Sequence, residues 1–236
     1  MLRLEDVHAG YGAVEVLRGV SLRVPPGSAV ALMGANGAGK TTLLKVVAGL
    51  VRSTSGRILL DGQPVEGASS QARSRLGICL VPEGRGIFRD LTVEENLAMF
   101  ATHRSLKDVV EYATEFFPAL RDRLRQPAGR LSGGQQQMVA VSRALVSEAK
   151  VIMADELSVG LAPVIIDEIY EAVAALRAQG RSLLIVEQYV DRALAVVDDI
   201  YVLHKGRIAF VGDPKLAVEQ NVFEAYLGSE VSAAHG

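Results

Sequence analysis

The sequence contains little of what secreted, membrane-spanning or nucleic-acid-binding proteins rely on. Its 236 residues include a single cysteine, Cys79, so no disulfide can form within the chain and a reducing compartment fits best. No apolar run approaches the roughly 20 residues of a membrane-spanning helix. The N-terminal residues show no basic segment followed by an apolar core, so we expect no signal peptide. A formal charge of -2 gives no support to a general nucleic-acid binder, and we expect a cytoplasmic protein.

The composition is that of a globular protein with a large core. Hydrophobic residues make up 49% of the sequence and charged residues 22%, so we expect a sizeable core rather than disorder. A chain of 236 residues is long for one compact domain and short for two full ones. We therefore expect one mixed domain with a smaller inserted or appended subdomain.

Short apolar runs and helical patterns alternate along the chain. The predicted strands cover residues 2–9, 16–24, 28–33, 56–62, 75–82, 151–155, 182–187 and 199–204. The predicted helices cover residues 43–50, 92–103, 107–117, 132–149, 163–179 and 189–197. Strands that alternate with helices favour a parallel sheet with crossover helices. The helical block between Leu91 and Ala149 is typical of an inserted subdomain.

A phosphate-binding loop is predicted at residues 34–41, GANGAGKT, which match G-x-x-x-x-G-K-[ST] between a strand and a helix. Its glycines let backbone N–H groups converge on phosphate oxygens, and the helix N-terminus adds a positive dipole end. Lys40 would reach the β- and γ-phosphates, the Thr41 hydroxyl would ligate Mg²⁺, and Thr42 would bond a phosphate further back. The alternative is a glycine-rich turn that merely contains a lysine, and such chance matches are expected in fewer than about one chain in a hundred. The predicted nucleotide-binding residues of this segment are Gly34, Asn36, Gly37, Ala38, Gly39, Lys40, Thr41 and Thr42.

Two consecutive acids follow a short buried strand in the segment VIMADE. Asp155 would leave the carboxyl end of that strand, the edge at which parallel sheets bind ligands. We interpret Asp155 as the carboxylate on the Mg²⁺ side, acting through water, and Glu156 as a general base for the attacking water. Two acids that simply begin a loop are the alternative, which a phosphate loop upstream makes less favoured.

A second anion site is predicted at LSGGQQQ, residues 131–137. A serine followed by two glycines at a helix start combines a hydroxyl with free backbone amides. The residues concerned are Ser132, Gly133, Gly134 and Gln135. One chain rarely needs two phosphate sites for one nucleotide, so the second site makes sense if it serves a nucleotide held by another subunit.

The phosphate loop, LSGGQ and the Asp155–Glu156 pair together resemble the nucleotide-binding subunit of an ABC transporter, over nearly the whole chain. The resemblance implies an α/β fold, with a P-loop NTPase core of mostly parallel sheet, an N-terminal antiparallel β subdomain and an inserted α-helical subdomain. It implies a single domain over residues 1–236, in which 1–83 and 150–236 form the ATP-binding core and 84–149 form the helical subdomain with the signature segment. It also implies ATP and Mg²⁺ as cofactors, and a head-to-tail dimer that sandwiches two ATPs between one chain's phosphate loop and the other's LSGGQ.

The resemblance assigns further residues by their position in the family pattern. Tyr11 matches the aromatic residue that stacks on adenine, although an ordinary half-buried strand tyrosine is the alternative. The segment SVGL, residues 158–161, matches a loop that touches the partner subunit. Glu83 stands in the loop that joins the core to the helical subdomain, where most members carry Gln, and it would act as a Mg²⁺ ligand. Gln188 stands at the switch position, where most members carry His, and it would orient phosphate and water without titrating. Leu157 replaces the usual Pro, and we expect only a more flexible backbone from it.

These departures, with GLAP at residues 160–163 and EAYLGS near the end, resemble one branch of the family. That branch comprises the ATP-binding subunits of branched-chain amino acid importers. It implies a second ATPase subunit that is identical or paralogous, two membrane permeases, and an extracytoplasmic solute-binding protein as an indirect partner. It also implies a peripheral position on the inner face of the cell membrane, without a nucleic-acid partner. Importers of urea, other amides or other amino acids share parts of the pattern.

Three other classes of function fit less well. Soluble ABC proteins of DNA repair or of ribosomes carry tandem ATPase units or long coiled-coil insertions, whereas this chain has one set of motifs. A small-molecule kinase or a GTPase would leave LSGGQ unexplained. A subunit that binds ATP without hydrolysis would not need Lys40, Asp155 and Glu156 together.

The resemblance implies that residues 84–97 form a groove for a short helix of the membrane partner. Ile87 and Phe88 would supply its apolar contacts, although a satellite cluster within the helical subdomain is the alternative for Phe88. Arg85 and Arg89 would either pair with acids on the partner or be solvated, and solvation is the default expectation. Glu187, next to Gln188, has no assignment beyond a structural one.

Overall fold

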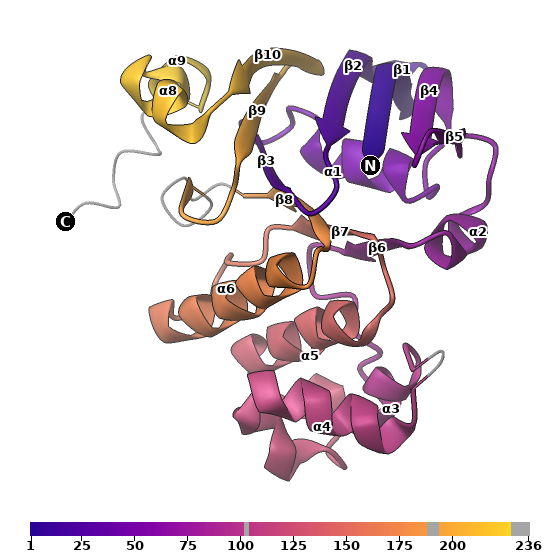
Figure 1. Ribbon diagram of the computed structural model, residues 1–236, viewed down its shortest axis with the longest axis vertical. Helices are drawn as coiled ribbons and strands as arrows, with labels where there is room; N and C mark the ends of the chain where they lie inside the picture. Colours follow the sequence, from indigo (N-terminus) through magenta and orange to yellow (C-terminus); the bar gives the residue numbers. More distant parts are fainter. Residues whose placement is uncertain (102–103, 188–193, 228–236) are drawn as a thin grey trace.

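The computed structural model describes residues 1–101, 104–187 and 194–227, and in these the chain forms two β-sheets (Figure 1). The smaller sheet is antiparallel, with strand order β2-β1-β4-β5, and the larger has order β10-β9-β3-β8-β7-β6. The strands are β1 (Leu2–Tyr11), β2 (Val14–Val24), β3 (Ala29–Met33), β4 (Ser53–Leu60), β5 (Gln63–Pro64), β6 (Ile78–Val81), β7 (Val151–Asp155), β8 (Ser182–Val186), β9 (Asp199–His204) and β10 (Arg207–Gly212). In the larger sheet every neighbouring pair is parallel except β9 and β10. The predicted combination of a mostly parallel sheet and an N-terminal antiparallel sheet is confirmed.

Helices connect the strands and cover both faces of the larger sheet. The described helices are α1 (Lys40–Val47), α2 (Ser70–Arg75), α3 (Val93–Ala98), α4 (Leu106–Phe116), α5 (Gly133–Val146), α6 (Pro163–Ala178), α8 (Pro214–Glu219) and α9 (Val222–Leu227), with short 3-10 turns at Pro118–Arg123 and Ala128–Arg130. Pro163 opens α6, where its missing N–H is harmless, and Gly180 follows the helix with a positive φ of 80°.

Alternation along the parallel strands divides the interior into two cores. In β3, Val30 and Leu32 face one core, whereas Ala31 and Met33 face the other, because successive strand residues point to opposite sides. The first core lies between the two sheets and contains the apolar face of α1. The second contains the apolar faces of α5 and α6 and much of the helical layer. The helices α1 and α5 therefore lie on opposite faces of the larger sheet, as Figure 1 shows.

The middle of the chain is helical, with α3, α4 and α5 packed on one another around the fully buried Phe117 and Leu120. Both α3 and α5 begin with a capping box, in which the N-cap side chain and the side chain three positions later each accept a hydrogen bond from the other's backbone N–H. The N-cap residues are Thr92 and Ser132. The division of the chain into a core of residues 1–83 and 150–236 and a helical subdomain of residues 84–149 stays a prediction.

Several elements were not predicted from the sequence. They are β5, β10, α2, α8 and α9. Of the helix predicted at residues 189–197, positions 189–193 lie outside the described residues. Within the described part of the chain, no helix is both long enough and apolar enough to cross a membrane.

Candidate active site

Four parallel strands bring the predicted catalytic segments to one edge of the larger sheet. The register pairs Leu32 of β3 and Asp155 of β7 with the same residue of β8, Val186. Val81 of β6 pairs with Ala154 of β7. The loops that leave these four strands at their carboxyl ends therefore start side by side. They carry the phosphate loop, Glu83, the Asp155–Glu156 pair and Glu187.

The phosphate loop has a backbone shape that requires glycine. Gly37 and Gly39 have φ values of 79° and 111°, a region that other residues rarely adopt. A Cβ atom at Gly34 would lie 2.4 Å from the Leu203 carbonyl oxygen of β9. No side chain hydrogen-bonds the first amides of α1 from its N-cap, Gly39. The N-terminal end of α1 thus offers backbone donors and a positive dipole end, which suits a phosphate group.

Lys40 is the first residue of α1 and is only 5% exposed. Its Nζ donates to the carbonyl oxygens of Gly34 at 2.7 Å and Ala35 at 3.3 Å, so the ammonium lies across the loop. Burial lowers the pKa of Lys40, and the negative charges of Glu156, Asp155 and Glu83 counteract that change. The three carboxylates that the sequence predicted for metal and water chemistry therefore all act on this one ammonium group.

Asp155 ends β7 and is 2% exposed. Burial raises the pKa of its carboxyl group, and the negative charges of Glu156 and Glu83 raise it further. A hydrogen bond with the Thr41 side chain and the positive charge of Lys40 oppose this rise. Its Oδ1 atom is buried and has no hydrogen-bond partner among the described residues. A buried oxygen without a partner is costly unless a ligand completes it, so Asp155 is suited to hold a cation or its water.

The residues predicted to hold Mg²⁺ fit that ion chemically. Thr41, Asp155 and Glu83 supply hydroxyl and carboxylate oxygens, the hard donors that Mg²⁺ prefers. The described residues contain no group of three or more His, Cys, Asp or Glu side chains arranged to hold a metal. A complete protein cage is not needed, since Mg²⁺ commonly binds one or two carboxylates together with water and substrate phosphates. Glu83 is exposed in the turn after β6, so it can approach a bound ion from the solvent side.

Glu156 follows Asp155 with its backbone in the left-handed region, at a φ of 51°. Its N–H donates to the Val186 carbonyl oxygen of β8 at 2.9 Å. A left-handed non-glycine residue costs free energy and persists only where its surroundings hold it. The Glu156 side chain therefore leaves the backbone in a different direction from the one that it would have if β7 continued through this residue.

The structure gives the neighbouring Leu157 a packing role. Its side chain is 2% exposed and lies in the core with Val173 and Leu176 of α6. The sequence had predicted no more than a flexible backbone here. The burial shows instead that an apolar anchor directly follows the two acids.

Glu187 was left without a role by the sequence, yet it is among the most buried charged residues at 1% exposure. Its Oε1 accepts a hydrogen bond from the Ser158 N–H at 3.2 Å, and its Oε2 accepts one from the Ser158 hydroxyl at 2.7 Å. Burial and the negative charge of Glu187 raise the pKa of the Tyr170 phenol on α6. The one signal in the sequence was the position of an acid directly after the apolar run of residues 183–186. Gln188, the predicted switch residue, lies outside the described residues.

Tyr11 lies at the end of β1 and is 50% exposed. It pairs with Val14 across the hairpin that joins β1 to β2. Val16 and Leu17, which follow in β2, lie against Gly39 of the phosphate loop, at 3.2 Å and 3.0 Å from the position of a Cβ there. The hairpin thus presents an open aromatic ring at the same end of the molecule as the phosphate loop. Adenine stacking on this ring stays a prediction.

The signature residues lie at the start of α5, a helix on the face of the larger sheet opposite α1. The Ser132 hydroxyl accepts from the Gln135 N–H at 3.3 Å, and Gln135 Oε1 accepts from the Ser132 N–H at 3.2 Å. A Cβ at Gly133 would lie 2.7 Å from Nη2 of Arg85, and one at Gly134 would lie 3.0 Å from Ile165 of α6. Gly133 and Gly134 thus lie against Arg85 and α6, and their helix packs in the core on the other face of the sheet from α1.

The expectation that Arg85 is solvated was wrong. Its Nη1 donates to Gln136 Oε1 of α5 at 2.7 Å, and its backbone has a positive φ of 74°. Arg143 of α5 likewise donates to the carbonyl oxygen of Gly86. Phe88 is 45% exposed, and the Arg143 guanidinium lies 5.7 Å from the centre of its ring. The loop that follows Glu83 is thus attached to the helix that carries the signature segment.

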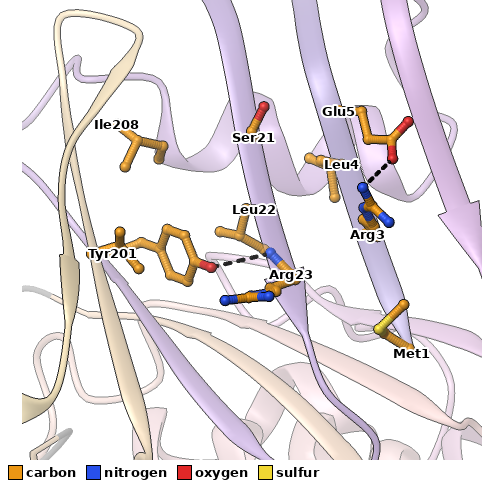
Figure 2. A pocket seen from close by; sticks show the side chains of 10 residues that line it. Met1, Arg3, Leu4, Glu5, Ser21, Leu22, Arg23, Tyr201 and Ile208 are labelled. Atoms are coloured by element: carbon orange, nitrogen blue, oxygen red, sulfur yellow. Dashed lines mark hydrogen bonds and ion pairs between the residues drawn. The ribbon is translucent and has the colours of Figure 1, made fainter.

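A separate groove of about 430 Å³ lies between the two sheets, on another part of the surface (Figure 2). Tyr201 of β9 points across it, and its hydroxyl accepts from the Arg23 N–H of β2 at 3.4 Å. On its far side Arg3 and Glu5 of β1 form an ion pair at 2.7 Å. None of the predicted site residues lines this groove, so we do not assign it to the active site.

Comparison with known proteins places the site in a family. A family model named ABC transporter matches residues 17–159. High-affinity branched-chain amino acid transport ATP-binding protein BraG of Pseudomonas aeruginosa is 44% identical over 97% of this chain and 100% of that protein. Probable branched-chain amino acid transport ATP-binding protein LivF of Archaeoglobus fulgidus is 38% identical over 95% of this chain and 97% of that protein.

Solved structures agree with this placement. A structure of the ATP-binding subunit of an ABC transporter superposes with a TM-score of 0.84 at 27% identity, over 98% of both chains. A nucleotide-free ATP-binding cassette from an ABC transporter gives a TM-score of 0.81 at 28% identity, over 94% of both chains. A matching phosphate loop, a matching fold and relatives that are similar over nearly the whole chain lead to one conclusion: this chain belongs to the ABC transporter family, as one of its ATP-hydrolysing subunits.

Proposed function

We propose that this subunit powers the import of branched-chain amino acids across the cytoplasmic membrane. The observation that carries the proposal is similarity over almost the full length to two ATP-binding proteins named for branched-chain amino acid transport. The Glu83 and Gln188 departures in the sequence support the same branch. The alternative is an importer of urea, of another amide or of another amino acid, and it is an outcome of the test below.

The nucleotide is held by groups that the fold has already oriented. The phosphates of ATP bind at the N-terminal end of α1, where the glycine-rich backbone supplies donors. Lys40, now bonded to the Gly34 and Ala35 carbonyl oxygens, exchanges those bonds for the β- and γ-phosphate oxygens. Tyr11 stacks on adenine from the end of the β1–β2 hairpin.

Thr41 through its hydroxyl, Asp155 through water and Glu83 through its carboxylate would hold Mg²⁺, together with phosphate oxygens. When bound, the ion supplies positive charge that stabilises the phosphoryl group during transfer. Burial is the main cause of the raised pKa of Asp155. The positive charge of a nearby cation would lower that pKa again and so favour the ionised carboxylate that binding needs. Glu83 adds negative charge close to Lys40 and Asp155, which is tolerable with the cation present.

Glu156 acts as the general base in hydrolysis. Its carboxylate takes a proton from the attacking water while the water oxygen bonds to the γ-phosphorus, and the bond to the ADP oxygen breaks. Lys40 stabilises the negative charge that builds on the phosphate oxygens. Gln188 orients water and the γ-phosphate through its amide, without changing its own charge.

The working enzyme is a head-to-tail dimer with two composite ATP sites. Ser132 and the following glycines face the γ-phosphate of the nucleotide on the partner subunit, which agrees with the placement of α5 and α1 on opposite faces of the sheet. Residues 84–149 act as the helical subdomain, and 1–83 with 150–236 act as the ATP-binding core. Two permeases bind the helical subdomain and hold the dimer on the inner face of the membrane, and a solute-binding protein acts through them.

The test compares the uptake of labelled leucine and labelled urea by cells that carry or lack the gene. Loss of leucine uptake alone, restored by the wild-type gene but not by Glu156→Gln, supports the proposal. Loss of urea uptake with normal leucine uptake would support the amide-importer alternative instead. A Glu156→Gln gene that restores uptake would contradict the assigned general base.

A further inference from the structure

The loop after β7 is attached to the end of β8 by three hydrogen bonds. The Glu156 N–H donates to the Val186 carbonyl oxygen at 2.9 Å. The Ser158 N–H and hydroxyl donate to the two oxygens of Glu187 at 3.2 Å and 2.7 Å. The two residues that flank Leu157 are thus both fixed to the segment 186–187.

The Glu187 contact is unusually costly to build, which argues that it has a specific use. A carboxylate at 1% exposure loses nearly all of its water, and its two Ser158 bonds compensate for part of that loss. An apolar side chain would fill the same place without this cost. Ser158 is also buried, at 2% exposure, so the pair is closed off from solvent.

What the contact fixes is the conformation of the loop that contains Glu156. The left-handed φ of 51° at Glu156 is unfavourable for a side chain with a Cβ and needs support on both sides. On one side lies Asp155, held in the sheet by β8. On the other side, Leu157 packs in the core and Ser158 is held by Glu187. Without the Glu187 contact, the loop would be free to relax after Leu157.

We propose that Glu187 is a positioning residue that acts through Ser158 to hold the loop in the conformation that directs Glu156 at the attacking water. This inference rests on the proposed role of Glu156 as general base. Its consequence is specific: loss of the contact should slow the chemical step while leaving ATP binding intact, because the phosphate loop and Tyr11 are untouched. A misplacement of about 1 Å in a catalytic group can cost about 100-fold in rate.

The test measures kcat and KM for ATP, together with the thermal unfolding midpoint, on the full-length chain with ATP and Mg²⁺. The variants are Glu187→Gln, Ser158→Ala and the double variant. We expect kcat to fall about 10- to 100-fold in each single variant, with KM changed by less than about threefold. The double variant should be no slower than the slower single one, since both changes break one contact.

Ser182→Ala is the matched control. Ser182 is a buried serine at the other end of β8, where its hydroxyl accepts from the Gly27 N–H at 3.0 Å, far along the strand from Glu156. It should lower the unfolding midpoint as Ser158→Ala does, but leave kcat unchanged. Should Glu187→Gln fail to fold, Ser158→Ala, which removes only the hydroxyl, supplies the same measurement.

Two results would overturn the proposal. The first is a wild-type kcat in folded Glu187→Gln and Ser158→Ala, which would leave only a structural role for the contact. The second is a double variant in which the two losses of kcat multiply, which would mean that Ser158 acts elsewhere, for example on the partner subunit. Glu156→Gln is measured in parallel. If that variant keeps wild-type kcat, the proposed general base is wrong, and this outcome is distinct from a failure of the Glu187 inference.

Discussion

Replacement of Arg73 by methionine should destabilise the protein by loosening the far end of the phosphate-binding helix. Arg73 lies on α2 and is 2% exposed. Its Nη1 donates to the carbonyl oxygens of Val46 at 2.7 Å and Val47 at 3.0 Å, in the last turn of α1. Its Nη2 and Nε donate to the carbonyl oxygens of Glu66 at 2.8 Å and Ala68 at 3.1 Å. One guanidinium therefore completes the C-terminal end of α1 and the loop that leads into α2.

The magnitude follows from two opposing effects. Each hydrogen bond from a charged donor contributes about 1.5–3 kcal/mol, so four have a gross value of about 6–12 kcal/mol. Burial lowers the pKa of Arg73, which reflects a desolvation cost that methionine does not carry. We expect a net loss of about 3 kcal/mol in the free energy of unfolding. In a domain of this size that loss lowers the melting temperature by about 6–12 °C.

Urea and thermal unfolding followed by circular dichroism, without nucleotide, measure this effect. Arg75→Met is the matched control, because Arg75 is on the same helix and exposed. Arg73→Lys should fall between the two, since an ammonium group cannot reach four carbonyl oxygens in the guanidinium geometry. If Arg73→Met melts within about 1 °C of Arg75→Met, the reasoning about buried carbonyl groups is wrong.

Three further predictions concern the site itself. Glu156→Gln should lower kcat for phosphate release by about 10²–10⁴, and Gln188→Ala should lower it less; the reverse order would contradict the assignment of the base. Glu83→Gln should weaken Mg²⁺ binding, because an amide oxygen replaces a carboxylate, and a Mg²⁺ titration of ATPase activity with an unchanged midpoint would refute this. Burial raises the pKa of Asp155 above 3.8, so its ionised form opposes folding once the pH exceeds that value. The gain in urea midpoint of Asp155→Asn over the wild type should therefore grow from about pH 4 to about pH 7, and a constant difference would contradict the raised pKa.

The parts of the fold that were predictable are those in which local pattern and burial coincide. The apolar run that ends at Asp155 forms β7, and the glycine-rich loop before Lys40 lies between β3 and α1 as the motif requires. By contrast, β10 is an edge strand whose four apolar residues, 208–211, follow one another without alternation, and α2 is a polar helix of six residues, so neither has a clear period. Such elements are held by contacts with distant residues rather than by their own sequence.

Contacts over long sequence separations also explain what the sequence missed at the site. Glu187 and Ser158 are 29 positions apart, and Arg85 and Gln136 are 51 apart. The neighbouring residues in the sequence do not distinguish a buried carboxylate, bonded to the N–H and hydroxyl of one serine, from a solvated carboxylate at the end of a strand. The left-handed backbone at Glu156 could not be predicted from the segment VIMADE either, since contacts with β8 impose it.

The placement of α1 and α5 on opposite faces of the sheet has a genetic consequence. In the proposed dimer, each chain contributes half of one ATP site and the other half of the second. A chain inactivated at Lys40 and a chain inactivated at Ser132 would therefore each be inert as a pure population. Mixed together, they would form some dimers in which both defects fall on the same site and the other site is intact. Two inactive alleles expressed in one cell could thus restore a measurable part of the ATPase activity that neither allele produces alone.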